Sequence, residues 1–94
     1  MATRKSISRK VDHYGEGCAL GHARALNWLT NPKRGNPAVG GTLQYQILEL
    51  AERFGAATNE DERQIIRGEI VGFSYAIECP ANAARCREAE ARRN

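Results

Sequence analysis

Residues 59–79, NEDERQIIRGEIVGFSYAIEC, carry the strongest helix pattern in this chain of 94 residues. Apolar side chains recur there every three or four residues, as they do on one face of an α-helix. This stripe consists of Ile66, Ile70, Phe73 and Ile77. Pro80 follows the stripe, and proline does not continue a regular helix. The pattern therefore predicts a helix over residues 59–79, about 30 Å long.

The start of this segment carries two overlapping capping signals. Thr58 is followed three residues later by Asp61. Asn59 is followed in the same way by Glu62. In a capping box the first side chain accepts a hydrogen bond from a helix amide, and the second reaches back. Either pair fits the start of the helix, and the acids at 60–62 also suit the positive end of the helix dipole.

Two further segments have the same periodicity. Residues 17–30 place Ala19, Ala23, Leu26 and Leu29 on one face. Asn31-Pro32 ends that helix, because the residue before a proline is disfavoured in the helical region. Residues 42–55 begin at Thr42, a good N-cap. They end at Gly55, which we expect to terminate the helix in the left-handed conformation.

These segments predict an all-α fold: a small bundle of three principal helices near 17–30, 42–55 and 59–79, in a single domain over 1–94. Residues 1–10 are predicted to form a flexible basic arm. Residues 80–94 are a polar tail, either a short exposed helix or a frayed end. The predicted shared core consists of Leu26, Leu29, Ile47, Leu50, Phe54, Ile66, Ile70, Phe73 and Ile77.

The net charge of +3 is unevenly distributed. Residues 43–79 hold seven acids against three arginines. The bases gather in the arm, as Arg4, Lys5, Arg9 and Lys10, in the 31–42 loop, as Lys33 and Arg34, and in the tail. An acidic body with basic segments predicts contact with an acidic partner or a phosphate backbone, unless these segments are only solvated.

Gly68 and Gly72 are four residues apart in the third helix, and Tyr75 continues their face. Glycine inside a helix costs about 1 kcal/mol relative to alanine. Two glycines on one face therefore indicate a close helix contact, either within the chain or between two copies. Because a chain of this length has a small core, a homodimer through Gly68, Gly72 and Tyr75 is expected.

The loop residues Gly40 and Gly41 precede the helix that begins at Thr42, close to Lys33 and Arg34. Free N–H groups at a helix start bind anions, and glycines let a ligand approach the backbone. The pattern differs from the nucleotide-binding P-loop, because no lysine follows the glycines. The loop is therefore either a phosphate-binding site or a polar connector.

No catalytic, metal or cofactor site is predicted. His13, Cys18 and His22 are the nearest approach to one, but they lack a fourth zinc ligand and an oxyanion motif. The three cysteines form no CxxC pair, so a disulfide framework is not expected. Because no catalytic motif is found, the protein is not expected to be an enzyme. No targeting segment or membrane span is apparent, which predicts a cytoplasmic protein.

In size and in its lack of motifs, the chain resembles the short accessory proteins of bacteriophages and mobile elements, which include anti-CRISPR inhibitors of host defence. Its segment from Leu48 to Ile77, with two helices and a short acidic turn, is similar to phage helical-hairpin proteins that sequester cyclic nucleotides. The first resemblance implies a non-catalytic interaction protein that binds and blocks a protein or nucleoprotein partner. The second implies a phosphate-binding module for nucleic acid or a cyclic nucleotide.

Overall fold

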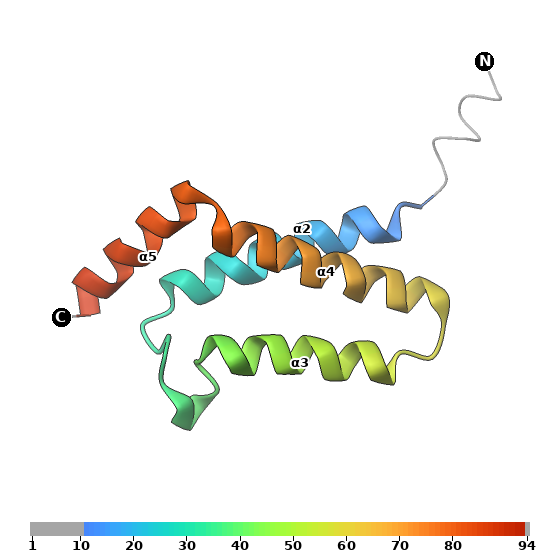
Figure 1. The fold of residues 1–94 in the computed structure, drawn as a ribbon, viewed down its shortest axis with the longest axis horizontal. Coiled ribbons are helices and arrows are strands. Elements are labelled where there is room, and N and C mark those ends of the chain that lie inside the picture. Colours follow the sequence, from blue (N-terminus) through green and yellow to red (C-terminus); the bar gives the residue numbers. More distant parts are fainter. Residues whose placement is uncertain (1–10, 94) are drawn as a thin grey trace, which may run out of the picture.

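The computed structural model describes residues 11–93, and these residues form an all-helical fold without strands. These residues form four α-helices and one short 3₁₀ helix, arranged as in Figure 1. They are α2 (His13–Thr30), η1 (Pro37–Val39), α3 (Leu43–Ala56), α4 (Glu60–Glu78) and α5 (Pro80–Arg93). The predicted all-α class is confirmed, but the polar tail is a fourth full helix.

The fold is built on a tight pair of parallel helices, α2 and α4 (Figure 1). Helix α3 follows α2 in sequence and runs in the opposite direction. Helix α4 therefore starts beside the start of α2 (Figure 1). Small residues repeat every four positions along each contact face. They are Gly17, Gly21 and Ala25 on α2, and Gly68, Gly72 and Ala76 on α4, all of them buried.

Side chains at the four glycines of this contact would overlap the opposite backbone. A Cβ atom on Gly17 or Gly21 would collide with the carbonyl oxygen of Ile65 or Glu69, respectively. Gly68 meets the carbonyl of Tyr14 in the same way, and Gly72 meets that of Cys18. The two backbones are in contact. Glycine is therefore required at these four positions because no side chain would fit, and not because of a special φ angle.

The helix starts follow the capping chemistry of the sequence. Thr42 caps α3 as predicted, because its Oγ1 accepts a hydrogen bond from the Tyr45 amide at 3.1 Å. Of the two signals before α4, the Asn59 pair is the one used, with the Glu62 amide donating to Asn59 Oδ1 at 2.8 Å. The Glu62 carboxylate reaches back to accept from the Thr58 amide at 3.0 Å.

One predicted helix start and one predicted helix end were wrong. Helix α2 begins at His13 instead of residue 17, because Asp12 caps it by accepting from the Gly15 amide at 2.9 Å. Helix α3 continues past Gly55 to Ala56, and Gly55 does not have the positive φ that we expected. Among the described residues only Gly35 and Gly40 have a positive φ.

The predicted core is partly correct. Leu29, Leu50, Ile66 and Phe73 are buried. Leu26, Phe54, Ile70 and Ile77 are half-buried. Ile47 was placed in the core wrongly: it is 51% exposed, because α3 turns Leu43, Leu50 and Phe54 inward and leaves Ile47 on its flank. The core instead gains the small side chains of Ala25, Ala76 and Ala89.

Helix α5 begins at Pro80 directly after α4 and is fixed by a buried amide. Asn82 is 4% exposed, and its Nδ2 donates to the Ala76 carbonyl at 2.8 Å, near the end of α4. The same carbonyl also accepts from the Cys79 amide at 3.3 Å, so the side chain of Asn82 ties α5 to the last turn of α4. One side of α5 therefore belongs to the fold, with Ala89 also buried.

Candidate functional site

The 31–42 loop is held closed by hydrogen bonds to its own backbone and to α2. Gly35 donates from its amide to the Gly41 carbonyl at 2.6 Å. The same carbonyl accepts from Trp28 Nε1 at 2.7 Å. The two glycines with positive φ, Gly35 at 88° and Gly40 at 69°, make the turns that this closure requires.

The amides of the loop glycines are engaged inside this loop. Gly40 donates to the Pro37 carbonyl at 3.4 Å, and Gly41 donates to the Asn36 carbonyl at 2.9 Å. Thr42 Oγ1 is occupied by its capping bond. A phosphate at this loop would therefore be recognised by side chains rather than by the glycine backbone.

The two loop bases have different surroundings. Lys33 is exposed, whereas Arg34 is half-buried. The Arg34 guanidinium lies 5.6 Å from the centre of the Trp28 ring and donates to the Cys86 carbonyl of α5 at 3.2 Å. Arg34 therefore also holds the loop to α2 and α5, while Lys33 is a surface charge.

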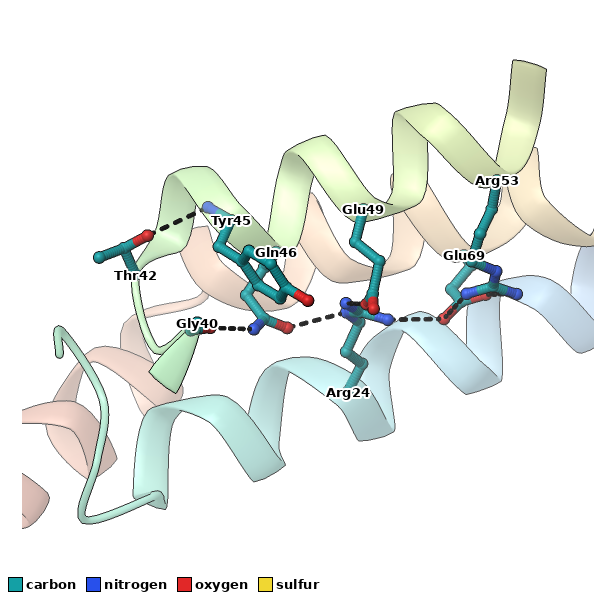
Figure 2. A network of polar contacts seen from close by, with 8 residues as sticks. All are labelled: Arg24, Gly40, Thr42, Tyr45, Gln46, Glu49, Arg53 and Glu69. Atoms are coloured by element: carbon teal, nitrogen blue, oxygen red, sulfur yellow. Dashed lines mark hydrogen bonds and ion pairs between the residues drawn. The ribbon is translucent and has the colours of Figure 1, made fainter. Parts of the chain in front are cut away.

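A polar network lies between α2, α3 and α4 (Figure 2). Its centre is Glu69 of α4, a carboxylate whose side chain is 8% exposed. Glu69 forms ion pairs with Arg24 of α2 at 3.6 Å and with Arg53 of α3 at 3.2 Å. Arg24 also pairs closely with Glu49, and its Nε donates to Gln46 Oε1 at 3.0 Å.

This network connects the loop to the interior of the fold. Gln46 Nε2 donates to the Gly40 carbonyl at 3.3 Å, so one continuous chain of contacts runs from the loop to Glu69 (Figure 2). Two arginines face two glutamates in it, and the four formal charges cancel. The network therefore fixes α3 against α2 and α4 without adding net charge to the surface above it.

A groove of about 540 Å³ lies above this network, between α2, the loop and α3. Its polar lining includes Arg24, Gln46 and Glu69, and its aromatic lining consists of Trp28 and Tyr45. Lys33, Arg34, Gly40 and Gly41 also line it, so the structure brings four of the predicted loop residues into one site. Three exposed apolar side chains complete the lining: Leu20 (52% exposed), Val39 (55%) and Tyr45 (46%).

Sequence reasoning did not find the groove residues Arg24, Trp28, Gln46 and Glu69. Glu69 lies beside the apolar stripe of α4, and a charge in that place was the one available signal. The arginines that pair with Glu69 lie on other helices, Arg53 16 positions and Arg24 45 positions earlier in the sequence. Only the packing of the helices brings them together.

The His13, Cys18 and His22 set does not converge. His13 lies 3.5 Å from Glu16 and 3.6 Å from Asp61, whereas His22 is exposed elsewhere on α2. Partial burial raises the pKa of the Tyr14 hydroxyl above its ordinary value, and the neighbouring Cys18 adds to this effect. Residues 11–93 contain no group of three or more His, Cys, Asp and Glu side chains placed to bind a metal.

Gly68 and Gly72 are buried against α2 of the same chain, so the alternative of close packing within the chain accounts for both. Tyr75 is 73% exposed on the outer side of α4. Self-association remains a prediction, but these two glycines are not accessible to a second copy while α2 and α4 are paired.

The charges divide between the two ends of the molecule. The acidic end, where α2 and α4 start, carries Asp12, Glu16, Glu60, Asp61 and Glu62 against Arg63 and Arg67, so the net charge of its described residues is negative. The basic end, where the loop meets α5, carries Lys33, Arg34, Arg85, Arg87 and Arg92 against Glu88 and Glu90, so its net charge is positive. The basic arm with Arg4, Lys5, Arg9 and Lys10 lies outside the described residues. It joins α2 at the acidic end, about 27 Å of helix away from Lys33.

Comparisons with known proteins give no relative: no family model, no curated protein and no solved structure matches the chain. No helix within residues 11–93 has the length and apolar character needed to cross a membrane.

Proposed function

We propose that this protein is a non-catalytic binding protein that occupies a surface on a macromolecular partner through the groove between α2 and α3. The observation that carries the proposal is the exposure of Leu20, Val39 and Tyr45 around one groove. Grouped apolar side chains on a surface commonly mark a contact site. Among residues 11–93, nine large apolar side chains are exposed and only four are buried.

The charge beside the groove indicates the chemistry of the partner. Lys33 is exposed at its edge, next to the arginines of the basic end. The four charges of the network below the groove cancel, so this edge dominates the local field. A protein or nucleoprotein with an acidic patch beside an apolar one would fit it. Binding there would block or regulate the partner, as the accessory inhibitors of phages and mobile elements do.

Capture from a bacterial lysate tests this proposal. A groove variant with Leu20→Ser and Tyr45→Ser should lose the partner that the wild-type chain retains. The matched control carries Val71→Ser and Tyr75→Ser, which change two exposed side chains on the outer side of α4. Equal capture by the two variants would show that the groove is not the binding surface. Nuclease treatment separates a protein partner, whose capture persists, from a nucleic acid, whose capture is lost.

A phosphate-bearing small molecule, such as a nucleotide, is the second candidate. The groove volume falls within the range of about 300–1,000 Å³ that is usual for ligand sites. Lys33 and Arg34 would meet the phosphate, and Trp28 lies in the wall. Trp28 is the single tryptophan of the sequence, so its fluorescence reports on the groove. Nucleotides should change this fluorescence in the wild type and much less in Lys33→Glu, whereas no change in the wild type would exclude this candidate.

A further inference from the structure

The outer side of α3 carries an apolar stripe that no part of residues 11–93 covers. We define the outer stripe as Ile47, Leu48, Ala51 and Gly55, all exposed. Their spacing of three or four residues aligns them along one side of the helix. Ile47 and Leu48 are 51% and 56% exposed, respectively. The groove lies on the other flank of α3, where Gln46 and Tyr45 line it, so the outer stripe is a separate surface.

Gly55 is the unexplained residue of this stripe. A Cβ atom there would meet nothing within 4 Å, and its φ is not positive. At every other helical glycine in residues 11–93, an added Cβ would collide with a neighbouring group. Glycine is a poor helix former, and neither a contact nor a conformation within residues 11–93 requires it here. Its position is consistent with a partner that approaches the backbone of α3 closely.

The stripe is self-complementary about its middle. Its bulky side chains, Ile47 and Leu48, lie toward one end and Gly55 toward the other, with Ala51 between them. Ile47 and Gly55 are each four residues, or about 6 Å, from Ala51. A two-fold axis through Ala51 would therefore place Ile47 of each copy over Gly55 of the other. Such an isologous contact uses the same patch twice.

Charge favours the same arrangement. Helix α3 runs from the loop with Lys33 to the turn before Glu60 and Asp61, so its two ends carry opposite charge (Figure 1). The side chains of Glu60 and Asp61 are 67% and 75% exposed, respectively. Two antiparallel copies of α3 would place the basic loop of each copy beside the acidic turn of the other. The dipoles of the two helices would also be opposed, which is favourable.

We propose that a second copy of this chain docks on the outer stripe, with its α3 antiparallel to the first. The resulting homodimer uses no residue that lines the groove except Lys33, whose charge at the groove edge would also face the acidic turn of the second copy. It also differs from association through Gly68 and Gly72, which are buried between α2 and α4.

Sedimentation equilibrium of the full chain tests the dimer. The wild type should dimerise in the micromolar range, and Ile47→Glu should weaken association at least about tenfold. Val71→Glu, on the outer side of α4, should leave it unchanged. Asp61→Lys should weaken association, most clearly at low salt. A wild type that stays monomeric at high micromolar concentration, or equal effects of Ile47→Glu and Val71→Glu, would overturn the proposal.

Two further variants test the position of the axis. Ala51→Cys should form a covalent dimer on mild oxidation, whereas Tyr75→Cys should not. Gly55→Leu should raise the melting temperature of the dilute monomer, because leucine favours the helix, and should weaken association by blocking the place of Ile47. Failure of Ala51→Cys to cross-link, or unchanged association of Gly55→Leu, would contradict this geometry.

Discussion

Individual glycines determine how closely α2 and α4 approach. At Gly21 and Gly72 the space for a methyl group is already filled by backbone atoms of the opposite helix, namely those of Glu69 and Cys18. Backbone cannot yield as a flexible side chain can, so even the smallest side chain must push the helices apart. The close pair would then lose packing along its full length.

Gly72→Ala should therefore destabilise the fold, although alanine is the better helix former. Inserting a methyl group into a filled contact costs about 1–3 kcal/mol, and rigid surroundings raise this cost. Ser74→Ala, two residues away on the exposed side of α4, should change stability by no more than about 0.5 kcal/mol. Urea denaturation of the two variants gives the comparison, and equal midpoints would refute the close contact at Gly72.

The first turn of α4 contains a carboxylate with a perturbed pKa. A hydrogen bond from Gln64 at 2.7 Å, followed by the interaction with Arg63, lowers the pKa of Glu60 below its ordinary value. A carboxylate with a lowered folded pKa stabilises the fold above its unfolded pKa, and this contribution is lost as the pH falls through the folded value. Gln64→Ala should raise the pKa of Glu60, as measured by carboxyl carbon NMR. An unchanged titration midpoint would show that the nearby arginines, Arg63 and Arg67, are responsible instead.

At the scale of elements, the sequence predicted which segments are helical more accurately than how they pack. Periodicity and caps such as Thr42 and Asn59 are local, and both were confirmed. The parallel pairing of α2 and α4 was not predicted. Gly17 and Gly21 are required by their contact with the backbone of α4, and no local feature of the sequence indicates that contact. The groove was missed for the same reason, because its residues come from separate helices.

Helix α3 is attached less firmly than the α2–α4 pair. Leu50 is its one buried residue, and Arg53 and Glu49 hold it through the Glu69 network. Elements with few buried apolar contacts open at lower free energy than the rest of a fold. Helix α3 is therefore the element that should separate first when this network is broken.

Glu69→Ala should release α3 selectively. The change leaves Arg24 without one of its partners in a partly buried site, and removing one member of a buried ion pair costs about 3–5 kcal/mol. The cost should be smaller here because the Arg53 side chain is 46% exposed. Amide hydrogen exchange should accelerate in α3 while α2 and α4 remain protected. Uniform acceleration in all three helices would mean that Glu69 supports the whole core instead.

At the scale of the whole molecule, the described residues carry charges of opposite sign at the two ends. The basic end lies next to the groove, whereas the acidic end lies across the length of α2. An acidic partner would be attracted by the basic end and therefore toward the groove beside it. Fields of this kind act mainly on the rate of encounter, and salt screens them.

Association of the captured partner should accordingly slow as salt is raised, and Lys33→Glu should slow it further while leaving the melting temperature unchanged. Lys33 is suited to this test because it is exposed. Arg34 is not, because its contacts with Trp28 and Cys86 make its replacement destabilising as well. The control is Asp61→Lys at the acidic end, which should not slow association with the partner. Surface-binding kinetics at several salt concentrations measure both variants. If Lys33→Glu changes only the dissociation rate, Lys33 makes a direct contact in the bound state, and attraction by the basic end is not what brings the partner to the groove.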